Sequence, residues 1–339
     1  MRIAVFDTHS YDRHSFDEAN QAFGHDLKYF ESRLSLETVA LARGFEGVCV
    51  FVNDQLNRPT LEALKAGGVR LVALRCAGFN NVDVAAAEEL DLPVVRVPAY
   101  SPYAVAEHTV ALLMALNRKI YRAYARVREG NFSLSGLVGF DVHGKTVGVI
   151  GTGKIGQVFA RIMKGFGCEV LAYDKFPNQD LADEIGLRYV SLDELYERCD
   201  ILSLHVPLAD DSLHMIDKAA VARMKRGVIL LNTSRGGLIE TAALIEGLKT
   251  GKIGGAGLDV YEHEAGVFFE DFSNRVIQDD ELARLLTFPN VVITGHQAFL
   301  TDTALHNIAE TTLGNISTIE AGEIPPTCVT RTLALPPRT

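Results

Sequence analysis

The sequence predicts an α/β protein with parallel sheets covered by helices on both faces. Short aliphatic and β-branched runs alternate along the chain with stretches of helical character. The runs are apolar throughout, which is typical of strands buried on both faces. A chain of 339 residues is long enough for two domains, each with its own core. The predicted strands are IAVF from residue 3, VCVFV from 48, LVALRC from 71, VVRV from 94, VGVI from 147, VLAYD from 170, ILSLHV from 201, VILLN from 228, AGLDV from 256 and VVIT from 291.

The composition is that of a folded globular protein and argues against several classes of function. Hydrophobic residues make up 47% and charged residues 22% of the chain, so we expect it to fold throughout. The 43 acidic residues outnumber the 33 basic ones, and no Lys/Arg block is present that would neutralise nucleic-acid phosphates. The N-terminal apolar run is too short for a secretory signal or a membrane span. We expect a cytoplasmic protein that binds neither nucleic acid nor membrane.

The five cysteines indicate neither disulfides nor a metal site. They are scattered, without a CxxC pair, and each lies beside apolar residues. Isolated cysteines of this kind are usually buried, reduced thiols. The five are Cys49, Cys76, Cys168, Cys199 and Cys328.

Between the first four predicted strands and the rest, residues 100–130 predict one long helix. Ser101 is suited to the N-cap, Pro102 to the first helical position and Gly130 to the end. A helix over 102–128 would measure about 40 Å. We expect this helix to link the two domains.

A further helix is predicted near the end of the chain. It begins at Asp302, with Thr301 as its cap and Gly322 as its stop. The tail that follows, residues 323–339, contains prolines and little periodicity, so we expect it to be irregular.

The stretch VGVIGTGKIG, residues 147–156, predicts a phosphate-binding loop. A strand leads into Gly151, Gly153 and Gly156, and a helix follows, which is the context in which G-x-G-x-x-G binds a dinucleotide. The first glycine allows a tight turn, the second lets the backbone approach the pyrophosphate, and the third lets the helix pack on the strand. Lys154 and Ile155 begin the helix whose free N–H groups would face the anion. Glycines also occur in turns that bind no ligand, so the glycine loop alone leaves a purely structural role open.

An acidic residue after the next strand favours NAD as the ligand. Asp174 follows Gly156 by 18 residues, close to the spacing at which a carboxylate meets the ribose hydroxyls of the adenosine. The same carboxylate would repel the 2′-phosphate of NADP, although Lys175 beside it leaves some use of NADP open. Together these features predict a Rossmann-type domain that binds NAD.

Further polar groups follow three other predicted strands, at the end where parallel sheets bind ligands. They are Arg235 in LLNTSRGG, Asp259 and Glu264 in GLDVYEHEAG, and His296 in VVITGHQAFLT. With RCAGFNNVD from residue 75, YSPYAVAEHTVAL from 100, GTGKIG from 151 and HVPL from 205, these motifs resemble the D-isomer-specific 2-hydroxyacid dehydrogenases, and within them the D-lactate dehydrogenase branch. The resemblance covers nearly the whole chain.

The resemblance implies a catalytic triad of Arg235, His296 and Glu264. The arginine would hold the carboxylate of a 2-keto acid, because a guanidinium binds it through two parallel hydrogen bonds. The histidine would give a proton to the keto oxygen as hydride reaches the keto carbon, since histidine exchanges protons near neutral pH. A glutamate on the other ring nitrogen would orient the ring and favour its charged form.

Each of these three residues also has a simpler interpretation. Arg235 lies in a polar turn, where structural ion pairs occur. Glu262 lies two residues earlier than the assigned glutamate and is a second candidate partner for the histidine. His296 is alternatively a core histidine, although the glycine and glutamine beside it favour an open turn.

The same resemblance implies the remaining contacts of the site. Backbone amides of the 77–79 loop would hold the far side of the substrate carboxylate. Three aromatic side chains would wall the substrate, although each is equally suited to a core. The expected substrate contacts are Ala77, Gly78, Phe79, Tyr100, Tyr103 and Phe299, and the expected cofactor contacts also include His205, Val206, Pro207, Ser212, Asn232, Thr233, Ser234 and Asp259.

Two features depart from the family pattern. Gly295 and Ala265 occupy positions where most relatives have proline, which puts local rigidity in doubt. Residues 266–282 form an acidic and aromatic insertion beside the site, which we assign only as a cover or a subunit contact.

The glycine loop begins well inside the chain, which predicts an inserted domain. Residues 1–99 and 297–339 would form a flavodoxin-like substrate domain, and residues 100–296 the NAD-binding domain. Closure about the two crossings would bring Gly78 toward Arg235. We expect a homodimer that reduces pyruvate to D-lactate with NADH. The alternatives are the same reaction on a bulkier 2-keto acid and, less favoured, an NAD(H)-sensing binding protein.

Overall fold

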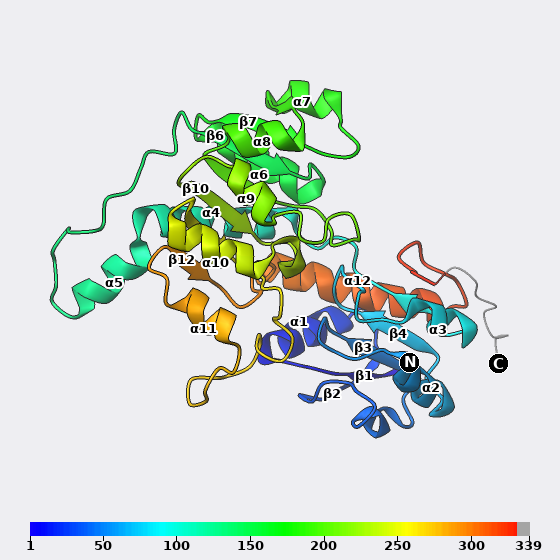
Figure 1. The fold of residues 1–339 in the computed structure, drawn as a ribbon. Coiled ribbons are helices and arrows are strands. Elements are labelled where there is room, and N and C mark those ends of the chain that lie inside the picture. Colours follow the sequence, from blue (N-terminus) through cyan, green and yellow to red (C-terminus); the bar gives the residue numbers. More distant parts are fainter. Residues whose placement is uncertain (331–339) are drawn as a thin grey trace. The chain divides into compact units, whose positions relative to one another are not determined.

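The structure of the protein is a computed structural model that describes residues 1–330. The chain forms two compact units (Figure 1). Unit 1 comprises Met1–Ser101 and the chain from Leu300, and unit 2 is Pro102–Phe299. The chain thus passes from one unit to the other after Ser101 and after Phe299. The sequence predicted these boundaries slightly earlier, after residues 99 and 296.

Unit 1 contains a five-stranded sheet whose strands are all parallel, in the order β2-β1-β3-β4-β5. Helix α1 (Ser10–Asn20) packs against α12 (Asp302–Glu320), which also contacts β4. Helix α2 (Arg58–Ala66) packs against α3 (Val84–Glu89) and the short helix η1 (Val39–Ala42). The strands are β1 (Arg2–Val5), β2 (Asp26–Tyr29), β3 (Gly47–Val50), β4 (Leu71–Leu74) and β5 (Val94–Val95).

Unit 2 contains a seven-stranded parallel sheet in the order β12-β11-β10-β9-β6-β7-β8. Its strands are β6 (Thr146–Ile150), β7 (Glu169–Tyr173), β8 (Arg188–Tyr189), β9 (Ile201–Leu204), β10 (Val228–Asn232), β11 (Ile253–Leu258) and β12 (Val291–Ile293). Its helices are α4 (Pro102–Arg118), α5 (Ile120–Arg128), α6 (Lys154–Gly165), α7 (Gln179–Ile185), α8 (Leu192–Arg198), α9 (Lys218–Arg223), α10 (Thr241–Thr250) and α11 (Asp280–Leu286), with the short helix η2 (Gly236–Leu238). The α/β class and the parallel sheets are confirmed.

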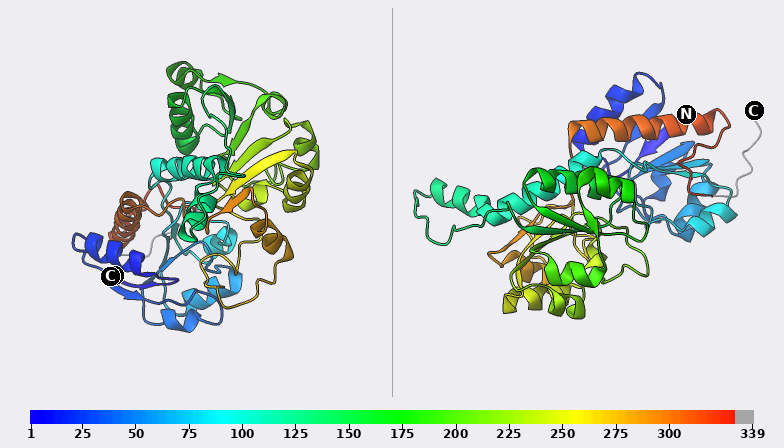
Figure 2. Two further views of the ribbon diagram at one scale, coloured as in Figure 1. Left: turned by 90° about the vertical axis from the view of Figure 1, so that its left-hand side faces the viewer. Right: turned by 90° about the horizontal axis from the view of Figure 1, so that it is seen from above.

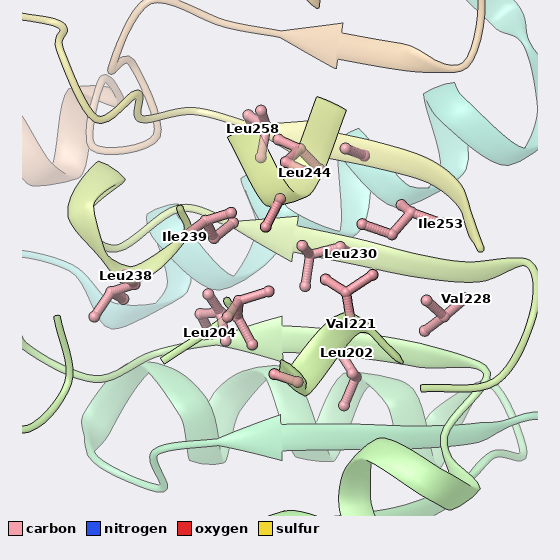
Figure 3. Packing of buried hydrophobic residues seen from close by; sticks show 14 of the residues in the cluster. Leu202, Leu204, Val221, Val228, Leu230, Leu238, Ile239, Leu244, Ile253 and Leu258 are labelled. Carbon is pink, nitrogen blue, oxygen red and sulfur yellow. The ribbon is translucent and has the colours of Figure 1, made fainter. Parts of the chain in front are cut away.

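Each face of the seven-stranded sheet carries its own hydrophobic cluster. On one face, Leu202, Leu230 and Leu258 from three adjacent strands pack beneath Val221 of α9 and Leu244 of α10 (Figure 3). The alternate strand positions, among them Ile201, Ile229 and Leu231, belong to the cluster on the other face, with residues of α4, α6 and α7. Because both alternating sets are buried, the central strands β9, β10 and β11 are mostly apolar on both faces.

The prediction of one long helix over residues 102–128 is wrong. The chain forms α4 and α5 with a break at Lys119, whose φ of +51° is left-handed. The side chain of Asn117 bonds both backbone groups of Phe140, at 2.8 Å each, so the returning chain docks where α4 ends. A Cβ at Gly139 would lie 2.7 Å from the carbonyl oxygen of Asn117. This tertiary contact ends a helix that neither glycine nor proline interrupts in the sequence.

The helix predicted from Asp302 is confirmed as α12. Its cap is Thr301, whose hydroxyl accepts from the amide of Ala304 at 3.2 Å, and Gly322 follows its end with a φ of +81°. After it, Val329 donates to the carbonyl of Val94 in β5 at 2.8 Å, so this part of the tail is held against the sheet. The rest of the tail predicted as irregular lies outside the described residues.

None of the five cysteines forms a disulfide within residues 1–330; Cys328 is half-buried and the other four are buried. Within residues 1–330, no three His, Cys, Asp or Glu side chains gather in a way that would hold a metal ion. None of the described helices is both long and apolar enough to cross a bilayer.

Candidate active site

The polar residues that the sequence singles out in unit 2 lie along one edge of its sheet. All seven strands are parallel, so their carboxyl ends share that edge. The strand order reverses between β6 and β9, which is the position where such sheets bind dinucleotides. From β7 to β12, the residues that follow the strands at this edge are Asp174, Gly151, His205, Arg235, Asp259 and His296.

The three glycines of the loop after β6 each meet a different steric requirement. Gly151 has a φ of +94°, and a Cβ there would lie 2.5 Å from the carbonyl oxygen of His205. A Cβ at Gly156 would lie 1.9 Å from the carbonyl oxygen of Gly151, so only glycine lets α6 pack on the loop. At Gly153 a Cβ would meet nothing within 4 Å, which leaves the loop open to a ligand.

Helix α6 begins at this open position without a side-chain cap. Gly153 is its N-cap and bonds none of the first N–H groups through a side chain. Lys154 is exposed, and Ile155 packs in part against the core. Uncapped N–H groups and the helix dipole favour an anion here, so the loop fits the pyrophosphate of a dinucleotide.

Asp174 is held at the end of β7 by the glycine loop itself. Its Oδ2 accepts from the amide and hydroxyl of Thr152, at 2.7 and 3.0 Å, and its Oδ1 accepts from the amide of Phe176 at 2.9 Å. Partial burial alone would raise the pKa of Asp174, but these hydrogen bonds lower it below its ordinary value. The carboxylate is therefore charged, as recognition of ribose hydroxyls requires.

Sequence reasoning missed Thr152 and Tyr189 in this arrangement. The hydroxyl of Thr152 lies 2.8 Å from that of Tyr189 on β8. Thr152 occupies a position that the glycine motif leaves free, and β8 has no continuous apolar run, so neither carried a signal.

The polar side chains of the loop after β9 form hydrogen bonds with the loop itself and with the preceding strand. The ring of His205 lies 2.8 Å from the hydroxyl of Ser203 and packs on Phe159, and burial lowers its pKa to about 3. Ser212 donates to the carbonyl of Pro207 and accepts from the amide of Ala209, both at 2.8 Å. His205 is thus neutral, and the side chains of His205 and Ser212 shape the loop that presents Val206 and Pro207. Their cofactor contacts stay predictions.

Arg235 lies in a loop after β10 that is fixed by backbone contacts. The side chain of Asn232 donates to the carbonyl of Arg235 at 2.8 Å, and Ser234 donates to the carbonyl of Val206 at 2.5 Å. A Cβ at Gly236 would lie 2.1 Å from the carbonyl of Tyr261, so this glycine lets the loop press against the chain after β11. The guanidinium itself donates to the carbonyl of Ser234 and forms no ion pair within residues 1–330.

Thr233 in the same loop contacts α4. Its hydroxyl lies 2.8 Å from that of Thr109, which in turn bonds the carbonyl of Val105. Thr233 is buried. The helix therefore fixes the chain two residues before Arg235.

The structure brings His296 and Glu264 together. The Nδ1 atom of His296 lies 2.8 Å from Oε1 of Glu264, and the second carboxylate oxygen accepts from the amide of Tyr261 at 3.0 Å. The two side chains are 17% and 21% exposed. The Nε2 atom of His296 has no hydrogen-bond partner within the described chain. One ring nitrogen is therefore fixed and the other is available.

Glu262, the second candidate, has a different partner. Its carboxylate bonds the ring of His214 at 2.5 Å and accepts from the amide and hydroxyl of Thr241, at 3.0 and 2.7 Å. Although partial burial would raise the pKa of Glu262, these bonds lower it. Glu262 thus joins two loops, and Glu264 alone of the two glutamates contacts His296.

The insertion beside the site contributes an aromatic residue that sequence reasoning did not identify. The ring of Phe269 packs on that of His296, with centroids 5.8 Å apart. Both residues have left-handed backbones, with φ of +68° and +55°. Strained residues of this kind cluster at functional sites. The insertion of residues 266–282 therefore contacts the histidine through Phe269, and its role as a cover or as a subunit contact stays a prediction.

Asp259 has an environment that differs from the expected cofactor contact. It is fully buried, and its carboxylate accepts from the amides of Gln297 and Ala298, at 2.9 and 2.8 Å, and from the hydroxyl of Thr294 at 2.5 Å. Its backbone carbonyl accepts from the amide of His296 at 2.8 Å. Asp259 therefore builds the loop that carries the histidine, and its contact with the cofactor stays a prediction.

The expected substrate contacts of unit 1 lie in the loop after β4. Arg96 donates to the carbonyl of Ala77 at 2.7 Å and lies over the ring of Phe79, and Cys76 bonds the carbonyl of Gly78. The amides of residues 77–79 make no hydrogen bond within the described chain. Of the three candidate aromatic walls, Phe299 is buried, Tyr100 is half-buried and Tyr103 is exposed.

Comparison with known proteins places this geometry in a family. Residues 110–298 match the family model described as D-isomer specific 2-hydroxyacid dehydrogenase, NAD binding domain. The D-lactate dehydrogenase of Escherichia coli is 54% identical over 326 residues, which cover 96% of this chain and 99% of that protein. Its apo-structure superposes with a TM-score of 0.90 and 50% identity, covering 97% of this chain and 100% of that one. The pyruvate reductase of Chlamydomonas reinhardtii superposes with a TM-score of 0.91 and 46% identity, covering 95% and 97%.

These matches extend over both units and confirm the resemblance stated from the motifs. The open glycine loop and the charged Asp174 fit NAD, which the matched domain binds. The chain therefore belongs to the D-isomer-specific 2-hydroxyacid dehydrogenases, in the D-lactate dehydrogenase branch, and is an NAD-dependent oxidoreductase.

Proposed function

We propose that the protein reduces pyruvate to D-lactate with NADH, and that Arg235, His296 and Glu264 carry the reaction. The observation on which the proposal depends is the 2.8 Å contact between Nδ1 of His296 and Glu264, with Nε2 left available. Arg235 follows β10, two strands away in the same sheet, and lacks an ion-pair partner in residues 1–330.

The chemistry of these side chains defines their roles. Glu264 accepts from Nδ1–H of His296 and so fixes the ring, while Nε2–H donates its proton to the keto oxygen. Arg235 binds the substrate carboxylate through the planar fork of its guanidinium, which also sets the orientation of the keto group. NAD in its reduced form supplies the hydride that reaches the keto carbon. A role of the Ala77, Gly78 and Phe79 amides in holding the substrate carboxylate, which the resemblance implies, stays a prediction.

Pyruvate is favoured over a bulkier 2-keto acid by the identities of the relatives. The D-lactate dehydrogenase of Escherichia coli and the pyruvate reductase of Chlamydomonas reinhardtii are 54% and 46% identical to this chain. The solved D-2-hydroxyisocaproate dehydrogenase is 33% identical, as are two other solved D-lactate dehydrogenases. The test is kcat/KM with pyruvate, 2-ketoisocaproate and phenylpyruvate, followed by chiral analysis of the product. Pyruvate should give the highest value and D-lactate the product. A higher value for either larger acid would reassign the substrate, and absence of turnover with all three would favour a binding protein.

We further propose a homodimer formed through α5 and the chain after it. This segment extends away from the rest of unit 2 (Figures 1 and 2), and α5 buries none of its residues. Exposed apolar side chains that cluster on one segment mark interaction sites on soluble proteins. Light scattering should give the mass of a dimer for the wild type and of a monomer for Phe132→Glu. The exposed apolar residues are Ile120, Tyr124, Val127, Phe132, Leu134 and Val138.

We propose that the protein is cytoplasmic, because its five cysteines form no disulfide within residues 1–330 and four of them are buried.

A further inference from the structure

We propose that His108 on α4 is a positioning residue for His296, acting through Thr294 and Asp259. This inference rests on the proposed function, in which His296 is the proton donor. The side chain of His108 is 18% exposed, and its Nε2 atom lies 3.4 Å from Oδ1 of Asp259, which is itself one of the expected cofactor contacts. Its role would be to fasten the loop after β12 to a helix that packs across β10, β11 and β12.

The first step is a hydrogen-bond chain whose direction is fixed by chemistry. The Nε2 atom of His108 lies 3.0 Å from the hydroxyl oxygen of Thr294, which lies 2.5 Å from Oδ1 of Asp259. An ionised carboxylate only accepts, so the hydroxyl donates to Asp259 and accepts from His108. His108 must therefore carry its proton on Nε2. A side chain without a donor at this point leaves the hydroxyl oxygen without its partner.

The second step connects Asp259 to the catalytic loop. Its carboxylate accepts from the amides of Gln297 and Ala298, and its carbonyl accepts from the amide of His296. His296 has a φ of +55°, a conformation that persists only where the surroundings enforce it. The bonds from Asp259 supply that enforcement on both sides of the histidine.

The third step is electrostatic. Asp259 is 0% exposed and forms no ion pair with lysine or arginine within residues 1–330. The basic side chain near it is that of His108, whose Nε2 lies 3.4 Å from Oδ1. Buried charges need hydrogen bonds or an opposite charge, so removing this partner loosens a group on which the loop depends.

The fourth step is that the same turn of α4 holds the other catalytic loop. Thr109, next to His108, bonds Thr233 two residues before Arg235. Adjacent residues of one helix therefore fasten the loops of both Arg235 and His296. Such second contacts decide whether catalytic groups hold their geometry, because displacements of about 1 Å cost on the order of 100-fold in rate.

The kinetic experiment compares His108→Leu, which removes the donor, with His108→Gln, which keeps an N–H group at the same reach. We expect kcat for pyruvate reduction to fall about tenfold in His108→Leu, with KM for NADH unchanged, and to recover in His108→Gln. His306→Leu, an exposed histidine on α12, is the matched control and should behave as the wild type. An unchanged kcat in His108→Leu, or equal loss in His108→Gln, would overturn the inference.

A double-mutant cycle guards against a folding defect in His108→Leu. Thr294→Val removes the same link from its other end and should lower kcat to a similar extent. Because both changes break one chain, the double variant should be no slower than either single variant. Losses that multiply would show that the two residues act independently, and the inference would fail.

Hydrogen exchange separates this inference from the proposed function. In the protein without cofactor, the amides of residues 296–298 should exchange faster in His108→Leu than in the wild type or His306→Leu. If the wild type reduces no 2-keto acid but exchange still rises, the proposed function fails and the anchoring of the loop stands. If the wild type is active but exchange and kcat do not change in His108→Leu, this inference fails by itself.

Discussion

The carboxyl edges of the two sheets both carry a charged residue shortly after a strand, but these residues differ in how far the fold satisfies them. In unit 1, Arg75 follows β4 and is 1% exposed. Its guanidinium bonds Asp12 and the carbonyls of Phe6 and Asp7, and it lies over the ring of Phe51. All three of its nitrogens are occupied, so the residue is structural.

In unit 2, Arg235 and His296 are held at one point and left available at another. The Arg235 guanidinium donates to the neighbouring carbonyl of Ser234, and His296 uses Nδ1 for Glu264. A charged residue after a strand therefore does not by itself indicate chemistry. What distinguishes the candidate catalytic edge of unit 2 is hydrogen-bonding capacity that the rest of the described chain leaves unfilled.

The largest expected effect is on the histidine of unit 2. His296→Ala should lower kcat by about 10³-fold, because the proton donor is lost, while the Kd for NADH remains near that of the wild type. Steady-state kinetics and NADH fluorescence titration measure the two quantities. A collapse of NADH binding would show that the residue holds the fold of the site.

A loss of stability without a loss of chemistry is expected in unit 1. Arg75→Leu leaves Asp12 buried without its ionic partner, which should lower the free energy of unfolding by about 3–5 kcal/mol. Urea unfolding gives the change, and kcat/KM of the protein that remains folded should stay near the wild-type value. Full stability in this variant would remove the contrast between the two edges.

Cofactor choice tests the charged residue at the β7 end of the catalytic edge. Asp174→Ala removes the carboxylate that would repel a 2′-phosphate, so the ratio of kcat/KM for NADH to that for NADPH should fall about tenfold or more. Asp183→Ala, an exposed acidic residue on α7, serves as the control. An unchanged ratio would reject the assignment of Asp174 to the ribose.

The smallest expected effect is a pH dependence of opposite sign in the two units. Burial raises the pKa of Asp54 in unit 1 from 3.8 to about 7. Its contribution to the stability of unit 1 is therefore complete below about pH 4 and is lost as the pH rises through 7. Burial lowers the pKa of His205 in unit 2 from 6.5 to about 3. Its contribution to the stability of unit 2 is therefore complete above pH 6.5 and is lost as the pH falls toward 3.

Acidification from pH 6.5 to 5 should therefore stabilise unit 1 relative to unit 2. Hydrogen exchange in graded denaturant, followed in β3 and β6, measures the two stabilities separately. Asp54→Asn should reduce the pH dependence of the stability of unit 1 only, and His205→Gln should reduce that of unit 2 only. Parallel slopes in both units would contradict these assignments.

The sequence predicted what periodicity and glycine spacing encode. Continuous apolar runs identified ten strands, but β2 and β8 are short edge strands with polar positions, such as Asp26 and Arg188, and gave no such signal. The break in the long helix at Lys119 depends on a contact with Phe140, which lies 21 residues further along the chain. Local propensity does not contain that information.

The site follows the same division. Arg235, Glu264 and His296 were predicted from the family resemblance, and their residue types match the chemistry expected after these strands. Thr152, His108 and Phe269 were missed. They contact Asp174, Thr294 and His296 respectively, and these contacts appear only when distant segments meet. The resemblance implied a cofactor contact for Asp259, which stays a prediction; the structure adds that its carboxylate binds the loop of His296, which the sequence did not indicate.

The most direct test of the contrast is the KM for pyruvate of Arg235→Lys at saturating NADH. Lysine keeps the charge but loses the fork, so KM should rise about 10- to 100-fold while the melting temperature stays that of the wild type. Arg226→Lys, at the opposite end of β10, is the matched control and should change neither value. A KM for Arg235→Lys close to that of the wild type would show that the unfilled guanidinium is not the substrate site.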